Sequence, residues 1–68
     1  MMTENMKIWL KELYLEEARD RRIVASNEHL WALGSDTNEA AMLHEMNADE
    51  NRAFAMMLEE MANEIEED

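Results

Sequence analysis

Proline is absent from this 68-residue chain, and Gly34, at its midpoint, is the only glycine. Proline and glycine are the residues that most strongly interrupt helices, so little in either half of the chain opposes a long helix. Alanine, leucine, methionine, glutamate, lysine and arginine, all good helix formers, dominate the rest of the sequence. The sequence therefore predicts two long helices that meet near Gly34.

The first predicted helix spans about residues 3–33. Thr3 can act as its N-cap, and Glu4 lies where a negative charge interacts favourably with the positive end of the helix dipole. One alternative stays open, because the polar run at residues 26–29 could end this helix and begin another.

The predicted turn covers residues 34–37. Gly34 suits the left-handed backbone position that follows many helices. Asp36, with Glu39 three residues later, matches an aspartate version of the capping box that begins a helix. A second helix is then expected over about residues 37–66, and the short connection makes it an antiparallel neighbour of the first.

A heptad pattern on the second helix predicts the surface that packs against the first. Its members recur at alternating spacings of three and four: Ala40, Leu43, Asn47, Glu50, Phe54, Met57 and Met61, with Leu58 and Ile65 widening the stripe. The matching face of the first helix is Met6, Trp9, Leu10, Leu13, Glu17, Val24, Asn27 and Trp31. Such spacing is typical of the seam of a packed helix pair. The whole chain, residues 1–68, is expected to form one all-α domain, an antiparallel two-helix hairpin of coiled-coil type.

Both expected seams become polar at the same level along the hairpin. A turn centred on residues 35–36 places residue i opposite about residue 71−i, so the polar positions face one another: Glu17, Asp20 and Arg21 against Asn47, Glu50 and Asn51. Such a layer can fix the register of two helices, as a buried asparagine does in coiled coils. The alternative is a solvated gap where the helices splay apart. The same register places Arg22 near Asp49, an exposed pair that would contribute about 0.2–1 kcal/mol.

The net charge of −11 is concentrated in the second half of the chain. Residues 1–33 carry six acidic and five basic side chains, a net −1, whereas residues 34–68 carry eleven acidic side chains and one basic one, a net −10. Nucleic acids are bound by clusters of lysine and arginine, so this balance argues against direct binding to DNA or RNA. It also disfavours anionic membrane surfaces. A basic surface on another protein is the more natural partner.

The outer side of the second helix is the candidate surface for that partner. Its predicted members combine negative charge with methionine, whose flexible side chain is common on adaptable binding surfaces: Glu45, Asp49, Glu59, Glu60, Met42 and Met56. Glu66 and Glu67 extend the same acidic surface. The alternative interpretation is an ordinary solvated face whose charge serves solubility.

A second apolar stripe lies on the first helix, away from the predicted seam: Ile8, Leu15, Ile23, Leu30 and Leu33. Exposed in a monomer, it would form the kind of contiguous apolar patch that marks an interface. A chain this short also buries a small core, and small folds often gain stability from a disulfide, a metal or a second subunit. We therefore expect a homodimer in which two hairpins form a four-helix bundle.

In size and layout such a hairpin resembles the Rop family of plasmid copy-control proteins. The resemblance is one of architecture alone, since no sequence motif is shared, and fold does not imply function. Rop-like binding to RNA would need a basic face, which this chain lacks.

Residues that usually support catalysis or metal binding are sparse. There is no cysteine, and the only histidines are His29 and His44. Di-iron proteins built on helix bundles place a glutamate three residues before a histidine, but Ser26 and Ala41 occupy those positions here. No glycine-rich loop could cradle a phosphate. The sequence predicts no catalytic residue, no metal site, no cofactor and no enzymatic activity.

The expected location is the cytoplasm, either of the producing cell or of an infected host. No segment approaches the roughly 20 consecutive apolar residues that a membrane helix needs. Glu4, Lys7 and Lys11 interrupt the apolar run that a signal peptide would require. The absence of cysteine fits a reducing compartment.

The leading functional hypothesis is a non-enzymatic protein–protein interaction module that occupies a basic, nucleic-acid-binding surface of a partner protein. Small acidic inhibitors of phages and mobile elements act in this way by mimicking nucleic acid, and some anti-CRISPR proteins are examples. The alternative is a structural or assembly subunit that docks through the apolar stripe of the first helix, with acidity serving solubility. The first predicts binding that weakens as salt rises, and the second predicts salt-tolerant association.

Overall fold

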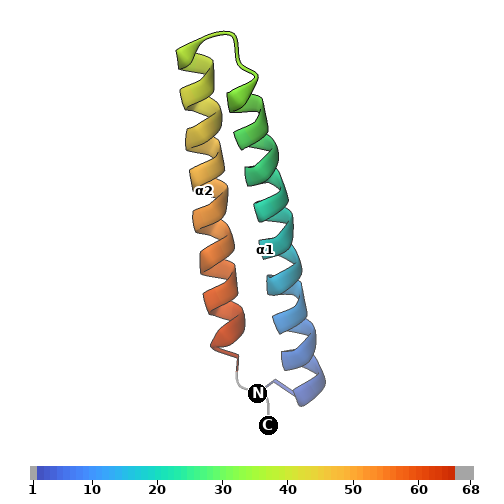
Figure 1. The fold of residues 1–68 in the computed structure, drawn as a ribbon. Coiled ribbons are helices and arrows are strands. Elements are labelled where there is room, and N and C mark those ends of the chain that lie inside the picture. The colour runs from blue at the N-terminus through green and yellow to red at the C-terminus, as the bar shows by residue number, and fades with distance from the viewer. Residues whose placement is uncertain (1, 66–68) are drawn as a thin grey trace.

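The computed structural model describes residues 2–65 as two long helices joined by a short turn (Figure 1). Helix α1 spans Glu4–Leu33, and helix α2 spans Asn38–Asn63. The helices lie side by side and antiparallel, in a rod of 52 × 13 × 13 Å (Figure 1). The predicted all-α hairpin is confirmed, and α1 continues without interruption through residues 26–29. The predicted end of the second helix, Glu66, lies outside the described residues.

Threonine hydroxyls cap the start of both helices. The backbone N–H of Met6 donates to the Thr3 hydroxyl at 3.2 Å, as expected. Helix α2 is capped by Thr37, whose hydroxyl accepts from the N–H of Ala40 at 3.1 Å. The prediction that Asp36 caps this helix is therefore wrong. Thr37 has the extended backbone of an N-cap, and this directs its hydroxyl toward the free N–H groups of the first turn.

Gly34 ends α1 without a left-handed backbone, contrary to the prediction. Its φ of −93° and ψ of 4° are accessible to any residue. Its N–H donates to the carbonyl of Leu30 at 3.2 Å. Ser35 satisfies two further carbonyls, because its N–H donates to Ala32 at 3.2 Å and its hydroxyl donates to Trp31 at 2.7 Å. The serine supplies the hydrogen bonds that a left-handed glycine often organises at this position.

Every buried residue between 2 and 65 is an alanine. They recur at intervals of seven on both helices and are between 0% and 7% exposed: Ala18, Ala25 and Ala32 on α1, and Ala48, Ala55 and Ala62 on α2. A repeat of seven keeps one face of a helix toward its neighbour. Because the alanine side chain is a single methyl group, the two backbones approach closely along this line. We call these six residues the alanine seam.

The predicted seam is therefore displaced by one position on both helices. The true contact line of α2 follows Ala48, Ala55 and Ala62, whereas the prediction followed Asn47, Phe54 and Met61. Among the residues proposed for the wider seam, Leu58 and Ile65 do lie half-buried. One residue turns a helix by about 100°, so the large side chains predicted to be inside flank the contact instead. The heptad spacing was recognised correctly, but the wrong member of the repeat was assigned to the interior.

Polar side chains alternate with the alanines along the contact. Arg21 donates from Nη1 to the Asn51 Oδ1 at 3.3 Å, and His44 Nδ1 lies 2.6 Å from Glu28 Oε2. The numbers in each pair add to 72, close to the predicted register of 71. Arg21 and Asn51, both named for the polar level, thus bond to each other across the helices.

The backbone at Gly34 has room for a side chain. A Cβ at this position would lie 3.8 Å from the carbonyl oxygen of Leu30 and 3.9 Å from that of Trp31, which are ordinary contacts. Gly34→Ala should therefore stabilise the hairpin by about 0.4–1 kcal/mol, because alanine restricts the unfolded chain more than glycine does. Chemical denaturation followed by circular dichroism measures this change. A loss of about 1 kcal/mol would indicate a left-handed backbone instead.

The capping residues of α2 can be compared directly. Thr37→Ala should destabilise the hairpin by about 1 kcal/mol, because the N–H of Ala40 loses its acceptor. Asp36→Ala is the matched control and should leave the unfolding free energy unchanged within about 0.5 kcal/mol. A larger destabilisation by Asp36→Ala than by Thr37→Ala would instead identify Asp36 as the cap.

Candidate interaction surfaces

The alanine seam divides the surface of the hairpin into two sides. On one side, residues of the two helices bond to each other across the seam: Arg22 to Glu59, through two contacts of 2.6 and 3.0 Å, and His29 to Glu45, at 2.6 Å. Arg22, His29 and Glu59 lie four positions after a seam alanine, and Glu45 lies three positions before one, which is the same place in the seven-residue repeat. Such positions meet at one edge of an antiparallel pair. We call this edge the charged side.

The opposite side is apolar and spans both helices. Val24, Trp31, Phe54 and Met61 each lie immediately before a seam alanine, so they flank the contact on the side away from the ion pairs. We call this surface the apolar face; its members are Met6, Leu10, Leu13, Val24, Trp31, Leu43, Phe54, Met57 and Met61. Leu10 is half-buried and the other eight are exposed. All nine had been predicted to lie between the helices.

The middle of the apolar face is polar. Glu17, Asp20 and Glu50 are exposed there. Glu17 bonds to Arg21 at 3.2 Å, and the Arg21 guanidinium also lies 5.2 Å from the centroid of the Phe54 ring. A cation over an aromatic face is attracted by its ring quadrupole. The face therefore has two apolar ends and a polar middle. In this middle, three acidic residues lie near one arginine, Arg21.

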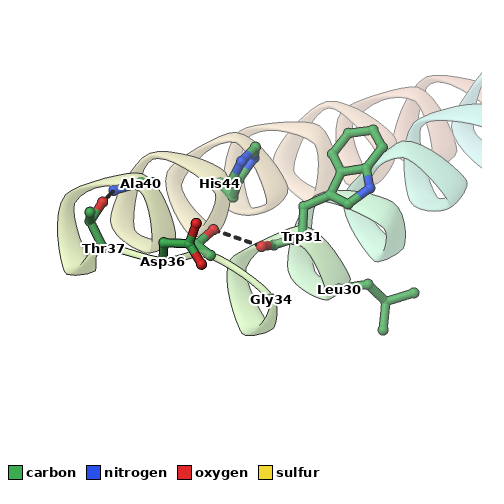
Figure 2. A pocket seen from close by; sticks show the side chains of 8 residues that line it. Leu30, Trp31, Gly34, Asp36, Thr37, Ala40 and His44 are labelled. Atoms are coloured by element: carbon green, nitrogen blue, oxygen red, sulfur yellow. Dashed lines mark hydrogen bonds between the residues drawn. The ribbon is translucent and has the colours of Figure 1, made fainter.

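An open hollow of about 620 Å³ lies at the turn end of this face. Figure 2 shows the Trp31 indole beside His44, with ring centroids 5.9 Å apart in an edge-to-face arrangement, while Leu30 points away from His44. Glu28 bonds to the His44 ring, and the hollow is lined by His44, Leu30, Trp31, Ala40 and the residues of the turn, 34–37. Such a surface can accept an apolar side chain of a partner, but it does not enclose a small molecule.

The outer side of α2 carries alternating acid and methionine. Spacings of three and four define a line on the outer side of α2, about 100–160° around the helix from the alanine seam. All its members are exposed: Glu39, Met42, Met46, Asp49, Ala53, Met56 and Glu60. We call this line the acid–methionine stripe. Met42, Asp49, Met56 and Glu60 had been predicted for such a surface, whereas Glu39, Met46 and Ala53 had not. The seven-residue repeat that runs back from Glu60 through Ala53 and Met46 to Glu39 is the signal that could have identified the additional members.

Two residues predicted for this surface do not belong to it. Glu45 and Glu59 lie at the charged side, half-buried, where they bond to His29 and Arg22 of α1. The reason is the same displacement by one position, which turns both carboxylates toward the other helix. Glu66 and Glu67 lie outside the described residues.

The ion pair between Arg22 and Glu59 changes the acidity of both groups. Its hydrogen bonds lower the pKa of Glu59 and raise the pKa of Arg22, and the attraction between the charges acts in the same direction. The prediction that Arg22 lies near Asp49 is wrong, since Asp49 bonds within its own helix to Arg52 at 2.8 Å. Arg22 of α1 is therefore bonded across the hairpin to Glu59 of α2, and not to Asp49.

The apolar stripe predicted for α1 is exposed along its whole length: Ile8, Leu15, Ile23, Leu30 and Leu33. The exposed fraction rises from about 40% at Ile8 to 72% at Leu33. These residues belong to one helix only, and they curve around its outer side away from the apolar face.

No group of three or more metal-binding side chains lies together within the described part of the chain. His44 and His29 each bond to a different glutamate, on separate levels of the hairpin. Neither α1 nor α2, over residues 2–65, has a stretch apolar and long enough to cross a membrane.

The Arg22–Glu59 pair makes a testable contribution to stability. Because the pKa of Glu59 is lowered on folding, the pair stabilises the hairpin above the ordinary pKa of a glutamate, and this contribution is lost as the pH falls through the lowered pKa. Glu59→Gln should therefore lower the melting temperature at neutral pH, and the difference from wild type should vanish in acid. Glu60→Gln, next to it on the outer side, is the control. An equal fall in melting temperature in both variants would show that the Arg22–Glu59 pair does not stabilise the hairpin.

Comparisons with known proteins give no relative from which a role could be transferred: the chain matches no protein-family model, no curated protein and no solved structure.

Proposed function

We propose that this protein is a non-enzymatic interaction module that uses the acid–methionine stripe of α2 to occupy a basic surface on another protein. The observation that carries the proposal is the stripe itself. Its acidic members Glu39 and Glu60 have no ion-pair partner among residues 2–65, and they stand at the two ends of a line of exposed methionines.

The charge distribution supports a basic partner. The second half of the chain carries a net −10, and within residues 2–65 Arg22 and His29 of α1 bond to Glu59 and Glu45 at the charged side, away from the acid–methionine stripe. The remaining charge produces a negative field along the helix, which accelerates encounter with a positive surface and makes the rate depend on salt. Methionine side chains between the carboxylates can then adapt to apolar groups of the partner.

A nucleic-acid-binding surface is the class of basic surface that fits best. Carboxylates spaced along a rod of 52 Å offer a linear array of negative charge, as a phosphate backbone does. In this proposal the protein acts by occupation, as an inhibitor of a phage or mobile element would, and it requires no catalytic group.

We further propose that the acting form is a homodimer, in which two hairpins build a four-helix bundle. The core of one hairpin consists of six alanines, and no larger side chain of residues 2–65 is fully buried. Each alanine contributes little apolar area, so a single hairpin has little to offset the entropy of ordering the chain. A second subunit is a common remedy in folds of this size.

A second candidate function is an assembly subunit that docks through the α1 stripe. It is favoured by the exposure of all five members of the stripe, Ile8, Leu15, Ile23, Leu30 and Leu33. Apolar docking tolerates salt, whereas docking through carboxylates does not, so the two functions differ in a measurable way.

The proposed function is tested by comparing two variants that carry the same change in net charge, one on α2 and one on α1. Glu39→Lys with Glu60→Lys reverses two exposed acids of the stripe, and Glu12→Lys with Glu16→Lys reverses two exposed acids of α1. Proteins captured from the producing cells by immobilised wild type are identified, and their affinities for the purified variants are measured. The α1 variant should retain a partner that the stripe variant loses, with affinity falling at least about tenfold as salt rises from about 50 to 500 mM.

Two outcomes contradict the proposal. If both variants bind the captured partner as tightly as wild type does, the stripe is a solubilising surface. If both lose it equally, net charge alone determines binding and the stripe has no special role. Salt-tolerant binding that is lost in Leu15→Glu would instead favour the assembly subunit.

A further inference from the structure

We infer that the apolar face is the surface on which a second copy of this chain packs, and that the predicted α1 stripe is not. The inference rests on the proposal that the hairpin acts as a dimer, and it assigns the residues that join the two copies. Three observations support it: the single layer of helices, the area the hairpin exposes, and the distribution of apolar residues between its helices.

The hairpin is a single layer of two helices, because α1 and α2 are the only elements of residues 2–65 and they pack side by side (Figure 1). Folded domains are built from at least two packed layers, because an amphipathic element must bury its apolar side against another element. The alanine seam joins the two helices within the layer, and the larger apolar side chains are left for the next one.

The exposed area has the size of an interface. The chain exposes 5334 Å², whereas a compact monomer of 8.0 kDa is expected to expose about 4,450 Å². The excess of about 900 Å² is close to the roughly 800 Å² that each partner buries in a standard stable interface. Covering one broad side of the rod with another copy removes an area of this order.

The apolar face is the side that such a copy can cover most fully. Val24 and Trp31 come from α1, and Phe54 and Met61 come from α2, so one contact buries residues of both helices at once. The opposite, charged side has its ion pairs across the seam, as in Arg22–Glu59, and a bundle leaves such pairs in solvent. A contact through the α1 stripe would leave Phe54 and the other apolar-face residues of α2 exposed.

The pattern of the face also suits a copy of itself. Its two apolar ends and its polar middle lie in line, so a second hairpin aligned level with the first places apolar on apolar and polar on polar. A two-fold interface of this kind is the commonest arrangement of homodimers. Glu17, Asp20 and Glu50 of the two copies then approach one another, with one arginine in each copy to offset them. This repulsion is screened by salt, so dimerisation should strengthen as salt rises, opposite to binding through the acid–methionine stripe.

Tryptophan fluorescence tests the inference without a destabilising substitution. Trp9→Phe leaves Trp31, on the apolar face, as the only tryptophan. At concentrations where sedimentation equilibrium reports a dimer, Trp31 should emit at shorter wavelength and be protected from acrylamide. Dilution below the dissociation constant should abolish both effects. The dissociation constant of the wild type should fall as sodium chloride rises from about 50 to 500 mM.

Paired variants then compare the two apolar surfaces. Val24→Glu with Phe54→Glu should raise the dissociation constant at least about tenfold, whereas Leu15→Glu with Leu30→Glu, on the stripe, should leave it within about threefold of wild type. A dimer in which Trp31 stays accessible to acrylamide, or one that only the stripe variant dissociates, would overturn the assignment of the face and leave the proposed dimer intact. A folded monomer at every concentration would overturn both, and neither result bears on binding through the acid–methionine stripe.

Discussion

The close contact between two lines of alanine is the interaction on which the rest of this structure depends. Ala18, Ala25 and Ala48 have essentially no exposed surface, and their methyl groups are small enough for two backbones to pack directly against each other. Once this contact is made, the positions on either side of it are fixed. The large residues of both helices must then lie outside the contact, and this is what produces an exposed apolar face on one side and interhelical ion pairs on the other.

This arrangement separates two tasks that small proteins often combine in one core. The alanine seam and the polar pairs, such as Glu28 with His44, specify that the helices are antiparallel and in register. The large apolar side chains, such as Trp31 and Phe54, are left to provide most of the available area for burial. In the proposed dimer, contacts between the two chains would supply most of the apolar burial, while the geometry of the hairpin is encoded within one chain.

Local features of the fold were predicted well because local chemistry determines them. Two helices, their meeting point and the Thr3 cap follow from the absence of proline, the single glycine and one hydroxyl placed before an acidic turn. The cap of the second helix was assigned to Asp36 because Glu39, three residues later, completes a capping box. The extended backbone that makes Thr37 the N-cap cannot be read from the sequence.

The orientation of the helices was not predictable by ranking side chains by hydrophobicity. That ranking assigns Phe54 and Met61 to the interior, but in a two-helix layer the interior is a narrow line that methyl groups fill best. The resulting error of one position then moved Glu45 and Glu59 to the outer surface, although they bond to α1. Because Ala18, Ala25 and Ala32 repeat every seven residues, as do Ala48, Ala55 and Ala62, this repeat was visible in the sequence and outweighs the hydrophobic signal.

The outward position of the methionines has a chemical consequence. All seven methionines between residues 2 and 65 have exposed side chains, and the chain has no cysteine to react in their place. Oxidation would convert their thioethers to polar sulfoxides without placing a polar group among the alanines. Oxidants would thus alter the exposed surfaces of α2 that we propose for binding while its contact with α1 persists, and methionine sulfoxide reductases could restore them.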